Sequence, residues 1–352
     1  MERELFALRM EEYRTMVEDF LDAQCVAADE PYARLLDAMR YSLTAGGKRL
    51  RPILTLEFCR LCGGDVHAAL PAACGVELLH TYSLIHDDLP CMDDDDLRRG
   101  KPSAHRALEQ DTGSAAIGRG LGLMLGDLLA TVCIDIANGA AEHMPNGTAM
   151  TSAFLNMQRE VEIGQILDLA VEQAPLRDAE ALATASLNVF RWKTASYTTI
   201  APIELALLGC GLDSENARAR ALSIGEPLGL AFQLEDDLID VIGSSRATGK
   251  PVGGDIREGK RTVLLADAIA AAAPSEQGEL IAMFEAPSRD ESDVRRAIDL
   301  FSSTGAVDRS HRRIEGLWDR ALQAIRDCRL PEQGENRLTE ACARFVPDIT
   351  SY

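Results

Sequence analysis

Two dense clusters of aspartate constrain this 352-residue chain more than any other feature. The first lies in residues 86–102, HDDLPCMDDDDLRRGKP, and the second in residues 232–240, FQLEDDLID. Neighbouring carboxylates repel one another and aspartate favours helix interiors poorly, so a fold tolerates such clusters best where cations neutralise them. Carboxylate oxygens suit Mg²⁺, which keeps several waters and takes further ligands from a substrate's phosphates. The paired clusters therefore predict a site for magnesium and phosphate.

The rest of the chain has the pattern of an all-α protein, with abundant alanine and leucine and few β-branched runs. Residues 243–259 and 273–291, rich in Gly, Ser, Pro or charge, are expected to be loops. No repeat or low-complexity linker divides the chain, so we expect one domain over residues 1–352, with long helices around a central substrate cavity. Apolar residues recur at three- and four-residue spacing over 4–24, 33–44, 53–62, 70–89, 114–141, 149–171, 178–191, 195–210, 215–242, 262–272, 291–303 and 307–328.

Charge excludes some partners. The net charge is −20, from 36 basic and 56 acidic residues, which argues against nonspecific nucleic-acid binding and against docking on an anionic membrane. The most apolar stretch, 113–141, is interrupted by Arg119, Asp127 and Asp135, so no membrane span is expected. The N-terminus lacks the basic start and apolar run of a signal peptide, and we expect a cytoplasmic protein.

Nine scattered cysteines show no disulfide framework and indicate free thiols in a reducing compartment. Cys59 and Cys62 could form half of a zinc site or a redox pair. Because no second pair follows them and their context is apolar, we interpret them as ordinary buried thiols.

Helical geometry favours the second aspartate cluster as a metal site. Successive helical residues turn about 100°, so Asp236 and Asp240 share one face of a helix. An isolated pair of this kind is usually a solvated acidic face. Here the surrounding helix is mainly apolar and is expected to face a core or a cavity.

The first cluster needs a bend. Asp87 and Asp93 would lie about 120° apart on an unbroken helix. Pro90 interrupts the helix between them, so the chain can curl and bring Asp93 back toward Asp87. We expect Asp94, Asp95 and Asp96 to be solvated or paired with Arg98 and Arg99 rather than to bind metal.

Basic residues gather near these clusters. Residues 46–52, GGKRLRP, form a glycine-hinged turn with three cations beside a helix start, which suits a diphosphate. Taken alone, this turn could equally be an ordinary basic loop. His80 lies seven residues before Asp87, about two turns along the same helix face.

Four segments together resemble the trans-prenyl diphosphate synthases, the head-to-tail isoprenoid chain elongators. They are residues 77–102, GGKRLRP at 46–52, FQLEDD at 232–237 and GKPVGGDIREGKRT at 249–262. The resemblance spans about residues 35–270 and implies the isoprenoid synthase fold, a homodimer, and three Mg²⁺ ions per active site.

The resemblance also implies residue roles. Asp87, Asp93 and Asp236 would bind Mg²⁺, supported by Asp88, Asp237 and Asp240. The allylic diphosphate would be held by Arg98, Lys193, Lys250 and Lys260, and isopentenyl diphosphate by Lys48, Arg51, His80 and Arg99. Thr194 and Gln233 would line the place where positive charge develops.

The implied reaction is ionisation of the allylic diphosphate, attack by the isopentenyl double bond, and loss of a proton to the departing pyrophosphate. An aromatic residue at Tyr82 resembles the bacterial farnesyl diphosphate synthases, and Tyr82 would limit product length, although helical geometry aligns Ser83 better with Asp87. The segment 195–202 and the glycine-rich run 113–122 depart from that pattern, which keeps geranylgeranyl diphosphate open as the product. The remaining alternatives are a non-catalytic modulatory subunit and a class I terpene cyclase.

Overall fold

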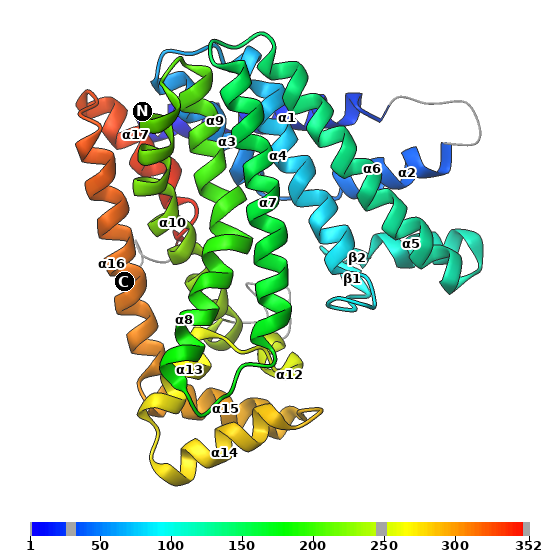
Figure 1. Cartoon of the computed structure of the whole chain (residues 1–352), viewed down its shortest axis with the longest axis vertical. Coiled ribbons are helices and arrows are strands. Elements are labelled where there is room, and N and C mark those ends of the chain that lie inside the picture. Colours follow the sequence, from blue (N-terminus) through cyan, green and yellow to red (C-terminus); the bar gives the residue numbers. More distant parts are fainter. Residues whose placement is uncertain (1, 26–32, 244–251, 348–352) are drawn as a thin grey trace. The chain divides into compact units, whose positions relative to one another are not determined.

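The structure is a computed structural model that describes residues 2–25, 33–243 and 252–347. The chain divides into two compact units, residues 1–158 with 201–218, and residues 159–200 with 219–352. Helices dominate both units (Figure 1), which confirms the all-α class. The prediction of a single domain stays a prediction.

The first unit contains a short hairpin and a group of long helices. In the hairpin, Leu97 pairs with Pro102 and Arg98 with Lys101 in antiparallel register. The helix α7 leaves this unit after Gln158, and α10 leaves it after Arg218. Its elements are α1 (Glu2–Ala23), α2 (Ala33–Leu43), α3 (Leu50–Leu61), α4 (Val66–Asp87), β1 (Leu97–Arg98), β2 (Lys101–Pro102), α5 (Ala104–Thr112), α6 (Ala115–Ala141), α9 (Ala201–Gly209), and the first parts of α7 (Gly147–Val171) and α10 (Ser214–Ile242).

The second unit continues α7 and α10 and adds a π-helix and the C-terminal helices. Its core includes Leu265 and Ile269 of α13, Leu300 of α15 and Ile325 of α16, all fully buried. Its further elements are α8 (Ala179–Val189), the π-helix η1 (Phe190–Ile200), α12 (Gly254–Glu258), α13 (Val263–Ala271), α14 (Pro274–Glu285), α15 (Glu291–Ser303), α16 (Ala306–Asp327) and α17 (Glu332–Ala343).

A stripe of glycines on α6 lets neighbouring elements approach closely. A Cβ atom at Gly118 would lie 2.6 Å from the backbone nitrogen of Glu109 in α5, and one at Gly126 would lie 2.0 Å from the His86 ring in α4. Gly122, between them, faces His105 of α5. The glycine-rich run that departs from a regular apolar helix is therefore the contact surface of α6 for α4 and α5.

One loop prediction was wrong. Residues 274–285 form the helix α14 instead of a loop, and Leu280, Ile281 and Phe284 are buried. The Pro and the charged residue that resemble a loop in the sequence lie in the first turn of this helix. Pro274 occupies its first turn, where a missing N–H costs nothing, and the Glu276 carboxylate accepts the Ala273 N–H at 3.3 Å. The expected loop 243–259 is also wrong in part, because Gly254–Glu258 form the helix α12. The helices α5 and α17 were not predicted.

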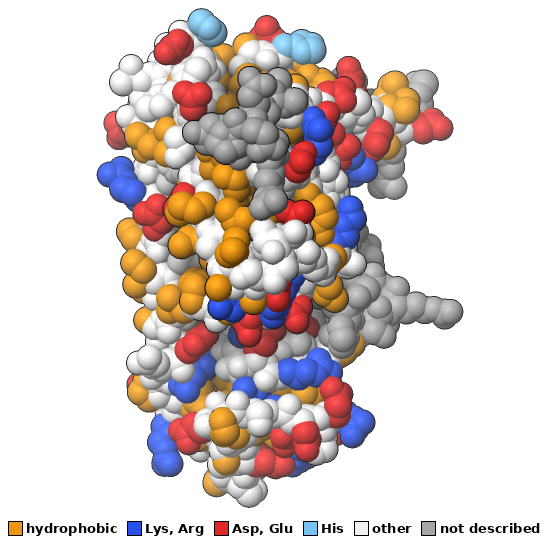
Figure 2. Space-filling model, turned by 90° about the vertical axis from the view of Figure 1, so that its right-hand side faces the viewer, with side chains coloured by type: hydrophobic (Ala, Val, Ile, Leu, Met, Phe, Trp, Pro, Cys, Tyr) orange, Lys and Arg blue, Asp and Glu red, His pale blue; other side chains and the backbone are white. Residues whose placement is uncertain are grey.

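Two helices, α4 and α6, are long and apolar enough to cross a membrane on length and composition alone. The apolar window of α4 is 67% buried within the structure, as in a core helix, whereas that of α6 is 33% buried. Ile117, Leu123 and Met124 of α6 are exposed. Figure 2 shows one face of the molecule, on which hydrophobic patches lie among charged side chains.

Candidate active site

The first aspartate cluster begins where α4 ends. The last helical residue is Asp87, and Asp88 caps the helix. The chain then turns back, so that the backbone N–H of Asp93 donates to the Asp87 carbonyl at 2.9 Å. The expected bend around Pro90 is present. The Asp87 side chain is buried and that of Asp93 is exposed.

Asp88 is held by a cation from the following hairpin. Arg98 forms an ion pair with Asp88 and a second one with Asp95, at 2.8 Å. Burial raises the pKa of the Asp88 carboxyl, although its hydrogen bond to Arg98 acts in the opposite direction. The predicted pairing of Asp95 with Arg98 is confirmed, whereas Asp96 pairs with Arg106 at 2.6 Å.

The basic turn at residues 46–52 meets the second arginine of the hairpin. Gly47 has φ +133°, and a Cβ atom there would lie 2.9 Å from the Arg99 guanidinium. Burial, followed by the charges of Arg51 and Arg99, lowers the pKa of His80 well below its usual value. Arg51, His80 and Arg99, predicted from separate segments, are therefore neighbours, and this group is called the basic cluster below. Lys48 is exposed on the same turn.

Arg49, the third cation of the turn, has a structural role. Its backbone is left-handed at φ 50°, and its side chain is buried. The guanidinium donates to Glu77 of α4 at 2.7 Å and to the Leu43 carbonyl at 2.5 Å. This buried ion pair ties the start of α3 to α4.

A pocket open to solvent in the first unit reaches Asp88, Arg98 and Arg99. Thr81, Leu84 and Ile85 of α4 line it. Tyr82 and Ser83 do not. Tyr82 is buried with its ring edge against His86, with ring centroids 6.0 Å apart, and the Ser83 hydroxyl donates to the His80 carbonyl at 3.0 Å.

In the second cluster, Asp236 is exposed and Asp237 is buried on α10. The Gln233 amide donates to Oδ1 of Asp237 at 3.2 Å, while Oδ2 of Asp237 is buried and has no hydrogen-bond partner. Burial, followed by the charge of Asp255, raises the pKa of Asp237 well above its usual value. A cation at Oδ2 would remove that penalty.

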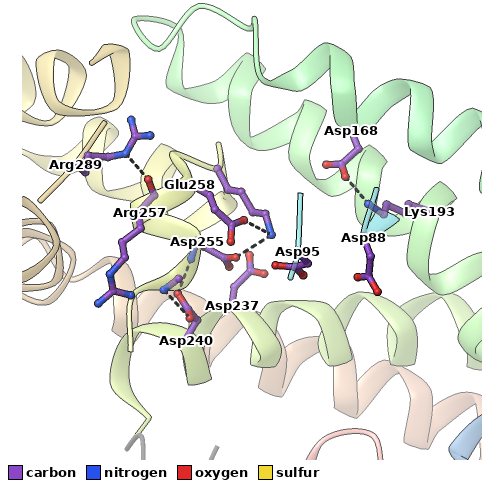
Figure 3. A network of polar contacts seen from close by, with 12 residues as sticks. Asp88, Asp95, Asp168, Lys193, Asp237, Asp240, Asp255, Arg257, Glu258 and Arg289 are labelled. Atoms are coloured by element: carbon purple, nitrogen blue, oxygen red, sulfur yellow. Dashed lines mark hydrogen bonds and ion pairs between the residues drawn. The ribbon is translucent and has the colours of Figure 1, made fainter. Parts of the chain in front are cut away.

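Asp240 fixes the start of α12 (Figure 3). Its Oδ1 accepts the Gly254 N–H at 3.0 Å and its Oδ2 accepts the Asp255 N–H at 3.1 Å. Lys260 pairs with Asp255 at 3.2 Å and with Glu258 at 2.9 Å. Asp237, Asp255 and Lys260 line a small pocket open to solvent. Lys250 lies outside the described residues.

Lys193 and Thr194 lie on the π-helix η1, a form that often marks functional sites. Thr194 donates its hydroxyl to the Gln233 amide oxygen at 3.1 Å, which completes a chain of hydrogen bonds to Asp237. Lys193 Nζ lies 2.5 Å from Asp168 of α7 (Figure 3). Gly164 permits this approach, because a Cβ atom there would lie 2.1 Å from the Lys193 backbone nitrogen.

Sequence reasoning missed Asp168 and Asp255. Asp168 has a signal, since it is the one acid in the otherwise apolar run 166–171, ILDLAV, four residues after Gly164. Asp255 lies in the segment GKPVGGDIREGKRT, but only the fold of α12 brings it beside Asp237 and Lys260. Neither position could be assigned a partner from helical spacing alone.

The carboxylates fit Mg²⁺. Oδ2 of Asp237 is a buried oxygen that lacks a hydrogen-bond partner. Among the residues that the structure describes, no group of three or more His, Cys, Asp or Glu side chains is arranged to hold a metal ion by itself. That agrees with the habit of Mg²⁺ of taking one or two carboxylates and completing its shell with water and phosphate.

Comparisons with known proteins agree on one group. The model of the family described as Polyprenyl synthetase matches residues 32–301. The heterodimeric geranylgeranyl pyrophosphate synthase large subunit 1 of Arabidopsis thaliana is 37% identical over 237 residues, which are 65% of this chain and 60% of that protein. The chain thus spans less than two thirds of that relative's length.

A relative of more even length is the short chain isoprenyl diphosphate synthase of Methanothermobacter thermautotrophicus. It is 34% identical over 279 residues, which cover 79% of each protein. Among solved structures, the geranylgeranyl pyrophosphate synthase from Corynebacterium glutamicum, complexed with isoprenyl diphosphate and magnesium, superposes with a TM-score of 0.82. Its sequence is 28% identical, and the match covers 97% of this chain and 98% of that one.

Proposed function

Because this chain belongs to the polyprenyl synthetase family, we propose that it is a prenyltransferase that condenses isopentenyl diphosphate head-to-tail with an allylic diphosphate. The observation that carries the proposal is the hydrogen-bond chain from Thr194 through Gln233 to Asp237, whose second oxygen lacks a partner. Lys193 precedes Thr194 on the π-helix η1. These residue types suit a reaction in which a diphosphate leaves and positive charge develops.

We assign the metal to both aspartate clusters. Asp87, Asp93 and Asp236 would hold three Mg²⁺ ions, with Asp88, Asp237 and Asp240 supporting them. When bound, Mg²⁺ neutralises charge on the diphosphate and makes it a better leaving group.

The protein's own cations divide between the two substrates. Lys193 and Arg98 hold the allylic diphosphate in this proposal, together with Lys250 and Lys260. Asp168 and Asp88 hold Lys193 and Arg98 in place before substrate arrives. The hydroxyl of Thr194 and the amide oxygen of Gln233 direct their dipoles toward developing positive charge.

The basic cluster, with Lys48, would bind isopentenyl diphosphate. Burial, followed by the positive charges of Arg51 and Arg99, lowers the pKa of His80 and favours its neutral form. A neutral imidazole can donate one hydrogen bond to a phosphate oxygen without adding repulsion to the two guanidiniums.

For product length we propose farnesyl diphosphate, supported by the bulky buried ring of Tyr82 on α4. Geranylgeranyl diphosphate is the second candidate, favoured by the names of two of the proteins to which the chain is similar. If Tyr82 limits the growing chain, Tyr82→Ala should lengthen the product by one isoprene unit or more, as sized by chromatography, and Tyr82→Phe should leave it unchanged. A Tyr82→Ala product of wild-type length would remove Tyr82 from this role.

We further propose a cytoplasmic homodimer. The nine cysteines are scattered and show no disulfide framework in the sequence, which favours a reducing compartment. The exposed apolar residues Ile117, Leu123 and Met124 of α6 offer a surface for a second copy. The high negative charge disfavours an anionic membrane as the alternative cover.

The proposed reaction is tested by incubating the purified chain with isopentenyl diphosphate and each allylic primer. Product should form with Mg²⁺ and disappear with excess EDTA. Asp87→Asn and Asp236→Asn should lower turnover at least about 100-fold, because each removes charge that holds the metal. Asp94→Asn is the matched control, since Asp94 is exposed in the same cluster and its φ of 53° tolerates asparagine. Full activity in EDTA would overturn the proposal.

A further inference from the structure

Three cysteines that play no part in the proposed reaction gather in the first unit. Cys59 lies near the end of α3, Cys62 caps that helix, and Cys210 follows α9. The sulfurs of Cys59 and Cys210 are 3.9 Å apart although 151 positions separate them in the chain. Cys62, expected to be buried, is exposed, while Cys59 is buried and Cys210 is half-buried.

The backbone between α3 and α4 leaves room for these sulfurs. A Cβ atom at Gly64 would lie 2.6 Å from the sulfur of Cys59 and 2.6 Å from that of Cys210. A side chain at this position would therefore fill the space in which the two sulfurs meet. The helices α3 and α9 also pack against each other, which holds Cys59 and Cys210 close together.

The polar surroundings of the two sulfurs differ. The Cys210 thiol donates to the Cys59 carbonyl, at the end of α3, at 3.5 Å. Hydrogen bonding with the Cys59 and Cys62 side chains lowers the pKa of Cys210, burial acts in the opposite direction, and the Gly64 backbone lowers it further. The same contact with Cys210, together with burial, raises the pKa of Cys59. The thiolate form is thus favoured at Cys210 and disfavoured at Cys59.

We propose that Cys210 is a peroxide-reactive thiol and that Cys59 resolves it as a disulfide. The Cys210 thiolate attacks one oxygen of hydrogen peroxide and breaks the O–O bond. The sulfur becomes a sulfenic acid, and the other oxygen leaves as hydroxide and takes up a proton to form water. Cys59 then attacks the Cys210 sulfur and displaces the second oxygen as water. Two thiols and one peroxide thus give one disulfide and two waters.

The disulfide would link the end of α3 to the chain that follows α9. It needs the two sulfurs to move from 3.9 Å to the bonding distance of about 2.05 Å, which side-chain rotation can supply in the space beside Gly64.

Brief treatment of the full chain with hydrogen peroxide, followed by thiol counting and peptide mapping without reduction, tests this proposal. The wild type should lose two thiols, show a Cys59–Cys210 peptide, and recover both with dithiothreitol. Its reaction should be about tenfold faster than that of Cys210→Ser, because an unperturbed thiol is only a few per cent thiolate at pH 7. Cys59→Ser should stop at a sulfenic acid that dimedone traps on Cys210.

Cys328→Ser is the matched control. Cys328 is also half-buried, and its thiol also donates to a helix carbonyl, at 3.4 Å, but burial raises its pKa. This variant should react as the wild type does. Circular dichroism of Cys210→Ser and Cys210→Ala establishes that each is folded. The proposal is overturned if folded Cys210 variants react at the wild-type rate, or if the disulfide maps to another pair.

Discussion

At the scale of single residues, two of the cations proposed to bind substrate are each paired with a carboxylate within their own unit. Asp168 holds Lys193, and Asp88 holds Arg98. A side chain fixed in this way loses little conformational freedom when it binds a phosphate. Sequence patterns predict the residues proposed to touch substrate, whereas their partners, such as Asp168, are found only in the fold.

Two cations distinguish the two diphosphate sites. Arg51→Ala should mainly raise the KM for isopentenyl diphosphate, and Lys193→Ala should mainly impair use of the allylic substrate. Each effect should be about 10- to 100-fold, since each change removes a charged hydrogen bond to phosphate. Arg106→Ala is the control, because Arg106 pairs with Asp96 and Glu109 at the surface. Steady-state kinetics with each substrate varied would contradict the assignment if both variants changed the same KM.

His80 should give the protein a pH dependence that His80→Gln removes. The pKa of His80 is lowered in the folded state. As the pH falls through about 6.5, His80 therefore binds a proton in the unfolded chain but stays neutral in the folded one. The free energy of unfolding of the wild type should therefore fall as pH falls, by up to about 1.4 kcal/mol at pH 5.5 relative to the variant. Urea unfolding at pH 7.5 and 5.5 measures this difference, with His67→Gln, an exposed histidine, as the control. Equal pH dependence in wild type and His80→Gln would contradict it.

At the scale of helices, periodicity predicts the long elements well and their ends poorly. The predicted helix 70–89 begins instead at Val66, because the Asp65 side chain caps its first turn, and it contains Pro71. Residues 195–210 divide into part of η1 and α9, since no sequence period distinguishes a π-helix from an α-helix. The helix α14 was not predicted, because the residue types that start a helix also form turns.

The glycine stripe of α6 permits a test within one helix. Gly118→Ala should destabilise the protein by about 1–3 kcal/mol, because the new methyl group would meet the backbone of α5 at 2.6 Å. Gly120→Ala, two residues away with nothing within 4 Å, should be neutral or stabilise by about 0.5–1 kcal/mol. Thermal unfolding of both variants decides the matter. Equal Tm values would show that α5 does not pack on Gly118 this closely.

At the scale of the whole molecule, the sequence predicted the family, the all-α class and some neighbours within each unit. It predicted less well which side chains are exposed. Arg51, His80 and Arg99 meet as expected because α4 and the hairpin bring distant segments together. By contrast, the 113–141 stretch was predicted to be helical and not to span a membrane, but no packing partner could be predicted for its glycines. The structure shows that α4 and α5 pack on the glycines of α6. Leu123 and Met124 of the same helix are exposed.

The exposed side of α6 leads us to predict a dimer. Apolar side chains left in water favour association, so the wild type should have twice the chain mass of 38.2 kDa by light scattering. The double change Leu123→Glu and Met124→Glu places two charges on this surface and should give the monomer mass with helical content unchanged. Leu8→Glu is the control, since Leu8 is 68% exposed on α1, and it should leave the mass unchanged. A monomeric wild type that sediments with neutral lipid vesicles would show that lipid, rather than a second copy, covers α6.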